Sequence, residues 1–466
     1  MSCKHHAGQS VSKMSPIDLH ANRACKPRIP QMKILQVSMS DSGGAGIAAV
    51  RLHLALLDKG VDCKLLTLQK TRDDIPEHYV FDKKDASSCP LLTQAMTFVD
   101  RVLKRFKLRS DYYRSRRKKY AYGSAQGTDM FNFNFSEYQI EKHSLAREAD
   151  IIHLHWVCGG FLDFQGFFNR VSNHVVWTLH DMNPFTGGCH YSYDCLGYEK
   201  DCHACPQLEG AKSNSAAERM LAQKIKVLQG QDRSLSIVTP SRWLMDCSEK
   251  SKLFGDYPHR HIYNIVNEKS FYLDDKARSR ERLSLPAEKK IILCIGSLDY
   301  ARKGNNIIAE ALPLLNHQDV ILCCVGRVSE AHKNDPSIVH LGYISDSDKM
   351  RDAYNAADVF VLPTMADNLP NTIVESLLCG TPVISYAVGG VTEQVNDRNG
   401  LLVNDRSPES MASALDAFFA EQSSYDPQSI AGEAHEKYAV GKTVDEHMDL
   451  YHAILSAEHA EGGAAT

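Results

Sequence analysis

Residues 363–380, PTMADNLPNTIVESLLCG, follow a largely apolar, β-branched run at 358–362 that is typical of a buried strand. Pro363 ends this run, a polar loop follows, and residues 372–379 have the pattern of a short helix closed by a glycine. A second apolar run at 383–386 predicts the next strand. The stretch therefore reads as a strand–loop–helix–strand unit, and open α/β sheets bind ligands at such loops.

Two carboxylates, Asp367 and Glu375, bracket the loop and the first helical turn, eight positions apart. Asp367 can meet a ligand at the mouth of the loop, and Glu375 lies near the positive end of the helix dipole. One carboxylate can hold sugar hydroxyls and the other a ribose, while N–H groups of the loop face a phosphate. The spacing alone fits an ordinary βαβ crossover with two surface acids equally well.

The letters DNLPNTIVE at 367–375 and CGTPVI at 379–384 resemble the nucleotide-sugar site of retaining glycosyltransferases of family 4, the group 1 glycosyltransferases. The resemblance spans roughly residues 32–455 and implies the GT-B fold, an α/β architecture of two Rossmann-like domains that face each other across a cleft. The family pattern has two Glu residues with seven residues between them. Here the first is Asp367, which leaves the donor-sugar preference open.

The first half opens with a strand at 33–37, a glycine-rich turn at 40–46, a helix and a second strand at 61–68. A glycine loop that leads into a helix N-terminus lets backbone N–H groups approach an anion. The spacing differs from the dinucleotide-binding G-x-G-x-x-G pattern. The family resemblance implies that Gly43 and Gly44 shape the acceptor side of the cleft.

The strand pattern DIIHLHW places His153 and His155 on the same face, because successive side chains of a strand alternate. Taken singly, each histidine is also consistent with an ordinary core residue. The resemblance implies that His155 lies beside the reacting sugar. The next predicted strand ends in His180 and Asp181, which we expect at the cleft on the acceptor side.

Four cysteines with the spacing C-x5-C-x6-C-x2-C form a Cys-rich insert at 189–205: Cys189, Cys195, Cys202 and Cys205. Four thiolates in so short a loop can satisfy tetrahedral Zn²⁺, so we predict a structural zinc site that braces the acceptor wall. A closed site of four ligands leaves no open position, which argues against a catalytic metal there. An iron–sulfur cluster, a redox disulfide pair and four unrelated thiols are the alternatives. Bacterial exopolysaccharide- and colanic-acid-type transferases similar to this chain carry such an insert.

The second half begins with a strand at 291–295 and a loop that contains Arg302 and Lys303. In the resembled family a basic pair at this point holds the donor pyrophosphate, and Lys303 matches the family lysine. Ser297 stands where the family has an arginine, and Arg302 is the obvious substitute. Fixed cations here would stabilise the diphosphate that leaves as the glycosidic bond breaks.

The resemblance implies distinct roles for the site residues. Asp367 is expected to hold the hydroxyls of the donor sugar, Glu375 the ribose, and the basic pair the diphosphate. The catalytic set is then His155, Asp367 and Lys303, and the donor-binding set is Arg302, Lys303, Gly326, Asp367, Asn368, Leu369 and Glu375.

The sequence divides into regions of different composition. We expect a disordered leader at 1–31, an N-terminal acceptor domain at 32–270, a C-terminal nucleotide-sugar domain at 285–430, a helix at 431–457 that crosses back to the first domain, and a tail at 458–466. The charged run between the domains, at 274–290, reads as a linker.

Residues 101–119 contain ten Lys or Arg residues and a single acid, Asp111, with apolar residues between them. A basic amphipathic stretch of this kind can lie on an anionic membrane surface or bind an acidic polymer. A solvated surface helix is the alternative.

The composition limits the location and the partners. The formal net charge of −4 argues against nucleic acid, no apolar run is long enough to span a bilayer, and the first 31 residues lack the apolar core of a secretory signal. We expect a cytoplasmic protein, with peripheral contact to the inner membrane through residues 101–119. Most of its 14 cysteines should be reduced.

The sequence thus predicts transfer of a sugar, with retention, from a nucleotide-diphosphate donor to a glycan or lipid-linked acceptor in cell-surface polysaccharide synthesis. Because no D-x-D motif stands beside the donor site, we expect catalysis without a divalent metal. A nucleotide-sugar epimerase or phosphorylase of the same fold, and a non-catalytic sugar-nucleotide-binding scaffold, are the alternatives. The donor sugar, the nucleobase, the acceptor and the linkage are not defined by the sequence.

Overall fold

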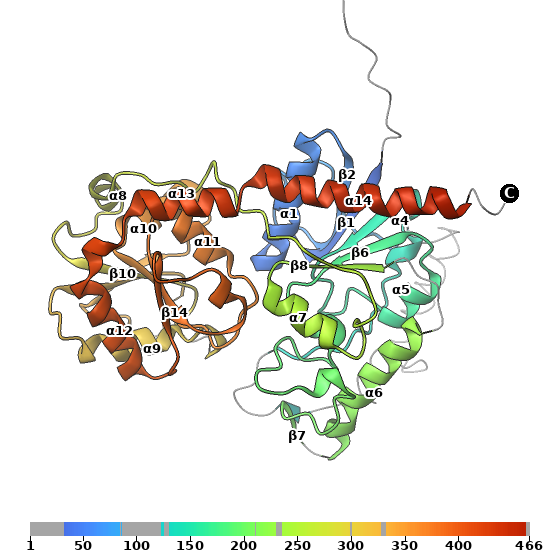
Figure 1. Cartoon of the computed structure of the whole chain (residues 1–466), viewed down its shortest axis with the longest axis horizontal. Coiled ribbons are helices and arrows are strands. Elements are labelled where there is room, and N and C mark those ends of the chain that lie inside the picture. Colours follow the sequence, from blue (N-terminus) through green and yellow to red (C-terminus); the bar gives the residue numbers. More distant parts are fainter. Residues whose placement is uncertain are drawn as a thin grey trace, which may run out of the picture.

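The computed structural model of the chain consists of two α/β domains, shown in Figure 1 in blue to green and in yellow to red. It describes residues 32–83, 85, 123–124, 130–209, 211–229, 235–298, 301–327 and 332–462. The predicted leader at 1–31, the basic segment at 101–119 and residues 463–466 of the predicted tail lie outside the described residues.

The N-terminal domain is built on a parallel seven-stranded sheet in the order β3-β2-β1-β5-β6-β8-β9. Its strands are β1 (Lys33–Ser40), β2 (Asp62–Gln69), β3 (His78–Val80), β5 (Ile151–Leu154), β6 (His174–Thr178), β8 (Leu235–Thr239) and β9 (His259–His261). Its helices include α1 (Gly43–Asp58), α4 (Ser144–Glu148), α5 (Phe164–Arg170), α6 (Ala211–Leu228) and α7 (Arg242–Lys250). A short antiparallel pair joins β4 (Gly123–Ser124) to β7 (Leu208–Glu209).

The C-terminal domain is built on a parallel six-stranded sheet in the order β12-β11-β10-β13-β14-β15. Its strands are β10 (Lys290–Ile295), β11 (Val320–Val325), β12 (Ile338–Gly342), β13 (Val359–Leu362), β14 (Val383–Tyr386) and β15 (Gly400–Val403). Its helices include α8 (Lys276–Arg282), α9 (Asn305–Ala311), α10 (Ser347–Ala356), α11 (Asn371–Leu378), α12 (Pro408–Ala420) and α13 (Pro427–Lys437).

The predicted fold class, two Rossmann-like domains, is confirmed. Every residue of β11, β13 and β14 is buried, as expected for parallel strands whose two faces are both covered. The strand order reverses at β1/β5 in one sheet and at β10/β13 in the other. Ligands of open α/β sheets bind beyond the carboxyl ends of strands at such reversals, so the topology marks these four strand ends.

The charged run expected to be a linker is largely packed against the C-terminal domain. Helix α8 begins at the N-cap Asp275, whose side chain accepts a hydrogen bond from the backbone N–H of Arg278. Lys276 and Arg280 form ion pairs of 2.9 and 2.8 Å with Asp358, at the start of β13. These partners lie far away in sequence, which is why composition alone suggested a linker.

Helix α14 (Val440–Gly462) leaves the C-terminal domain and runs across the N-terminal one, as the red helix in Figure 1 shows. Its apolar residues Val444, Tyr451 and Ile454 join a core cluster with Ile34 of β1 and Leu56 of α1. The last helix of the second domain therefore completes the core of the first.

Candidate functional site

A cleft with a volume of about 920 Å³ lies between the two domains, at the carboxyl ends of both sheets. The N-terminal domain lines it with residues that follow β1, β5 and β6, and the C-terminal domain with residues that follow β10 and β13. All four strands at the order reversals thus contribute to one cavity. The site residues predicted from sequence that line it are Gly43, Gly44, His180, Asp181, Arg302, Lys303, Asp367, Asn368 and Leu369.

The C-terminal wall carries two cations around one carboxylate. Lys303 Nζ forms an ion pair with Asp367 Oδ2, and Arg302 Nη1 lies 3.6 Å from the same oxygen. Arg302 also donates a hydrogen bond of 2.8 Å to the carbonyl of Ala366, which fixes its guanidinium against the loop. Two positive charges face one negative charge, so this wall retains net positive charge for an anionic ligand.

Glycines allow the loops of this wall to touch. Gly304 has a φ of 64°, and a Cβ there would lie 2.1 Å from the carbonyl oxygen of Pro363. A Cβ on Gly390 would lie 1.8 Å from the carbonyl oxygen of Asn368. A side chain at Gly304 would push the loop with Asp367 away from the loop with Lys303, and one at Gly390 would push it away from the segment that follows β14.

Asn368, in the loop between β13 and α11 that carries Asp367, connects this loop to the N-terminal domain. Its amide nitrogen donates hydrogen bonds of 3.3 Å to the carbonyls of Leu179 and His180, and its oxygen accepts one of 2.5 Å from Ser241. Asn368 lines the cleft, but its side chain is occupied by these contacts between domains. In this structure it holds the two walls together.

Glu375 lies one turn into α11 and is not among the residues that line the cleft. Its carboxylate forms an ion pair of 2.8 Å with Arg51 of α1 and accepts a hydrogen bond of 3.1 Å from the hydroxyl of Tyr354. To hold a ribose, as the sequence suggests, the carboxylate would have to share or release the Arg51 contact. Its role toward a ribose stays a prediction.

His155 lies behind the cleft wall rather than on it. It is 3% exposed, its Nδ1 lies 3.1 Å from Nε2 of His180, and its Nε2 contacts Oε1 of Gln36. The amide nitrogen of Gln36 donates to the hydroxyl of Tyr451 at 3.4 Å, so its oxygen accepts from His155 Nε2–H. His155 Nδ1 then accepts from His180, and His180 is the histidine that faces the cavity.

Burial keeps these histidines neutral. It lowers the pKa of His155 well below its usual range, and neighbouring histidines lower it further. Burial lowers the pKa of His180 to about 4. Near neutral pH these two rings therefore act as hydrogen-bond partners, and the positive charge at the cleft comes from Arg302 and Lys303.

Acid should destabilise the protein through its buried histidines. Burial also lowers the pKa of His447 to about 4, and the ring hydrogen-bonds to the carbonyl of Thr443 at 2.8 Å. The unfolded chain takes up a proton near pH 6.5 and the folded chain only near pH 4. Stability present at neutral pH is thus lost as pH falls through this window, by up to about 1.4 kcal/mol per pH unit for each such histidine.

We expect urea unfolding between pH 7 and pH 4.5 to show this slope, and His447→Gln to make it shallower. His452 is exposed on the same helix, so His452→Gln serves as the control and should keep the wild-type slope. An unchanged slope in His447→Gln would contradict the assignment.

The N-terminal wall contains a buried carboxylate–imidazole pair. Asp181 Oδ2 lies 2.6 Å from His190 Nδ1 and accepts a hydrogen bond of 2.8 Å from Trp156, while Oδ1 accepts one of 2.9 Å from the N–H of Asn183. Burial alone would raise the pKa of Asp181, but His190 and these donors lower it overall. The carboxylate of Asp181 is therefore occupied by contacts within the wall, and its role is to hold the wall in place.

Sequence reasoning missed several cleft residues on this wall, among them Trp156 and His190. Each of these two lies next to a residue already singled out, namely His155 and Cys189. Their positions directly after a predicted strand and beside the cysteine insert were the available signals. Gly326, in contrast, was predicted at the donor site and does not line the cleft. It packs against the backbone of the loop after β10, where a Cβ would lie 2.7 Å from the carbonyl oxygen of Gly296.

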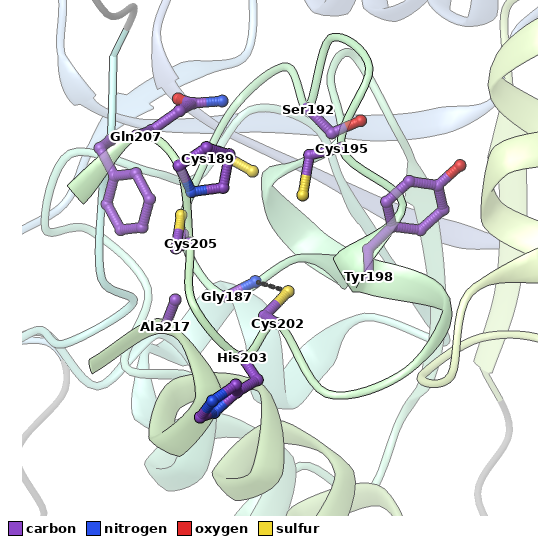
Figure 2. A pocket seen from close by; sticks show the side chains of 13 residues that line it. Gly187, Cys189, Ser192, Cys195, Tyr198, Cys202, His203, Cys205, Gln207 and Ala217 are labelled. Carbon is purple, nitrogen blue, oxygen red and sulfur yellow. Dashed lines mark hydrogen bonds between the residues drawn. The ribbon is translucent and has the colours of Figure 1, made fainter. Parts of the chain in front are cut away.

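The four cysteines of the insert line a separate, small cavity in the N-terminal domain (Figure 2). All four are free thiols. In the part of the chain that the structure describes, no group of three or more His, Cys, Asp or Glu side chains is already arranged to hold a metal ion. The predicted zinc stays a prediction, as does catalysis without a divalent metal. Among the described helices, none is long and apolar enough to cross a membrane.

Residues 289–421 match the family model described as "Glycosyl transferases group 1". Among curated proteins, the chain is 26% identical over 296 residues to a protein of Escherichia coli K12 named "Putative colanic acid biosynthesis glycosyl transferase WcaC"; the match covers 59% of this chain and 69% of WcaC. The matches to two further curated glycosyltransferases span 53% and 46% of those proteins.

Solved structures share the fold over nearly the whole chain. Sucrose-phosphate synthase from Thermosynechococcus elongatus superposes with a TM-score of 0.59 at 18% identity, covering 91% of this chain and 100% of that one. Alr3699/HepE of Anabaena, in complex with UDP and glucose, superposes with a TM-score of 0.58 at 16% identity and the same coverage. At these identities the likeness shows the two-domain fold.

Proposed function

We propose that this chain, a group 1 glycosyltransferase of the GT-B fold, transfers a sugar from a nucleoside-diphosphate donor to a glycan or lipid-linked acceptor with retention at the anomeric carbon. The observation that carries this proposal is the pair of cations, Arg302 and Lys303, set around Asp367 at the carboxyl ends of β10 and β13. The relative named for colanic acid biosynthesis supports a place in polysaccharide synthesis.

In this proposal the bond between the anomeric carbon and the diphosphate oxygen breaks first. Lys303 and Arg302 stabilise the negative charge that develops on the departing diphosphate. Asp367 accepts hydrogen bonds from hydroxyls of the donor sugar and thereby holds the sugar ring in a fixed position relative to the two cations. Because both cations come from the protein, the step needs no divalent metal.

The chemistry of the opposite wall favours retention. An inverting reaction needs a base that takes the acceptor proton on the face opposite the leaving group. Among the described residues of this wall, Asp181 is engaged by three donors, and His180, with a pKa near 4, is a weak base. Both ring nitrogens of His190 are occupied, by Asp181 and by Asn132. The departing diphosphate can instead take the acceptor proton on its own face, where the acceptor oxygen bonds to the anomeric carbon.

The test is a panel of UDP-, GDP- and ADP-sugars, with binding measured by calorimetry and release of nucleoside diphosphate followed over time. We expect one donor to bind and to release its diphosphate slowly without acceptor, and the NMR coupling of the transferred sugar to show the donor's anomeric configuration. Conversion of the donor to another nucleotide-sugar would identify an epimerase. Binding without turnover, even with polysaccharide or lipid-linked acceptors, would favour the scaffold.

The same assay tests the independence from metal. Activity should survive EDTA during an assay of minutes. Loss of activity in EDTA that Mg²⁺ or Mn²⁺ restores would contradict the role given to Arg302 and Lys303.

A further inference from the structure

We propose that Cys189, Cys195, Cys202 and Cys205 bind one zinc ion, and that this ion fixes the wall of the cleft that carries Asp181 and His190. The proposal is independent of the transferase reaction, because it concerns a cavity separate from the cleft.

The four thiols converge from loops between β6 and β7, where the described chain has no long helix or strand of its own. Figure 2 shows their sulfurs turned toward the same space, and all four side chains line the small cavity. Three of them are at most 9% exposed. In the described chain these side chains are not arranged as a group that could already hold a metal ion, so the ion would draw the sulfurs in to Zn–S distances of about 2.3 Å.

Backbone N–H groups point at two of the four sulfurs. Gly197 donates to Cys195 Sγ at 3.4 Å, and Gly187 donates to Cys202 Sγ at 3.3 Å. Such donors stabilise sulfur that carries negative charge, which is the form that binds a metal.

The turn that joins the last two cysteines is strained. Cys202 and Ala204 have φ angles of 56° and 51°, in the left-handed region that side chains other than glycine rarely adopt. A conformation of this kind costs on the order of 1–3 kcal/mol and persists where the surroundings enforce it. A metal that holds both Cys202 and Cys205 would supply that constraint.

The histidines beside the insert are engaged elsewhere, which leaves a ligand set of sulfur alone. His190 contacts Asp181 at 2.6 Å and Asn132 at 2.9 Å, and the exposed ring of His203 contacts Glu218 at 3.0 Å. Four thiolates in tetrahedral geometry are typical of zinc or of iron–sulfur clusters. The cavity has room for a single metal centre, and we assign that centre to zinc.

The cysteine cavity is directly connected to the cleft wall. His190, which contacts Asp181, is the next residue after Cys189. The hydroxyl of Thr186 donates a hydrogen bond of 2.7 Å to the carbonyl of Cys189, and buried Lys224 donates one of 3.0 Å to the carbonyl of Thr186. Loss of the ion would thus loosen the segment that positions His190.

The test uses the full-length protein purified without chelators. Plasma mass spectrometry should find about one zinc per chain, and replacement by Co²⁺ should give the thiolate charge-transfer and tetrahedral d–d absorption bands of a tetrathiolate site. Cys202→Ser should lose the bound metal. Cys247→Ser, at a half-buried cysteine of α7 outside the insert, is the matched control and should keep it.

A chelator should lower the melting temperature of the wild type and of Cys247→Ser to that of Cys202→Ser. If Cys202→Ser fails to fold, the metal content and the Co²⁺ spectrum of the wild type still decide the matter. Iron with acid-labile sulfide would overturn the assignment to zinc. Absence of any bound metal, together with no Co²⁺ spectrum, would overturn the site itself.

Discussion

Lys303→Ala is expected to lower kcat/KM for the nucleotide-sugar donor by about 10²- to 10³-fold, the range seen when one preorganised donor to a developing anion is removed. Lys303 is the cation that pairs directly with Asp367, and its side chain is only 26% exposed, so little water can replace it. The variant should also bind the free nucleoside diphosphate more weakly, because the same ammonium group faces that anion.

The measurement is kcat/KM at saturating acceptor, together with the Kd of the nucleoside diphosphate. Lys349→Ala removes the same group from an exposed position on α10 of the same domain and should leave both values unchanged. A loss in Lys303→Ala no larger than that in Lys349→Ala would contradict the role of Lys303.

Asp367→Asn is expected to lower kcat by about 10²-fold, the effect typical of a misplaced reacting group. In contrast to Lys303→Ala, this variant should show no loss of affinity for the free nucleoside diphosphate. The substitution removes a negative charge beside Lys303 and Arg302, so the diphosphate should bind as well as before or more tightly. Asparagine has nearly the same shape as aspartate, so the buried loop should keep its structure.

Two further variants sharpen this result. Asp397→Asn, at an exposed acid of the same domain, should change neither kcat nor Kd. Asp367→Glu keeps the charge and lengthens the side chain to that of the family pattern, so it should retain more activity than Asp367→Asn and can change the preferred donor sugar. A loss of diphosphate binding in Asp367→Asn as large as that in Lys303→Ala would contradict the model of charge at this wall.

The strands were predictable because their signal is local. The run at 383–386 is apolar apart from Ser385 and is recovered as β14 with the same bounds. Helix α1 was harder, because its first turn consists of the glycines that had suggested a loop. It begins at Gly43, and a Cβ on Gly46 would lie 2.5 Å from the carbonyl oxygen of Ser40, so glycine is needed for the helix to start so close to β1.

The site was predictable at the level of loops and less so at the level of side chains. The loops with Lys303 and Asp367 meet because the carboxyl ends of neighbouring parallel strands lie at one edge of the sheet. His155 contacts Gln36, which lies 119 positions earlier in the chain, and Glu375 contacts Arg51, which lies 324 positions earlier. A single sequence carries no signal for such distant pairs, and these two residues accordingly lie off the cleft wall.

The path of α14 has a consequence for how the protein is made. The core around Ile34 and Leu56 contains Tyr451 and Ile454, which leave the ribosome only after the whole second domain. About 190 residues separate β9 from that part of α14, which corresponds to roughly 10–40 s of translation at 5–20 residues per second. During this interval Ile34 and Leu56 lack the contacts that α14 provides, and chaperones that shield apolar surfaces would act on them until the final helix docks.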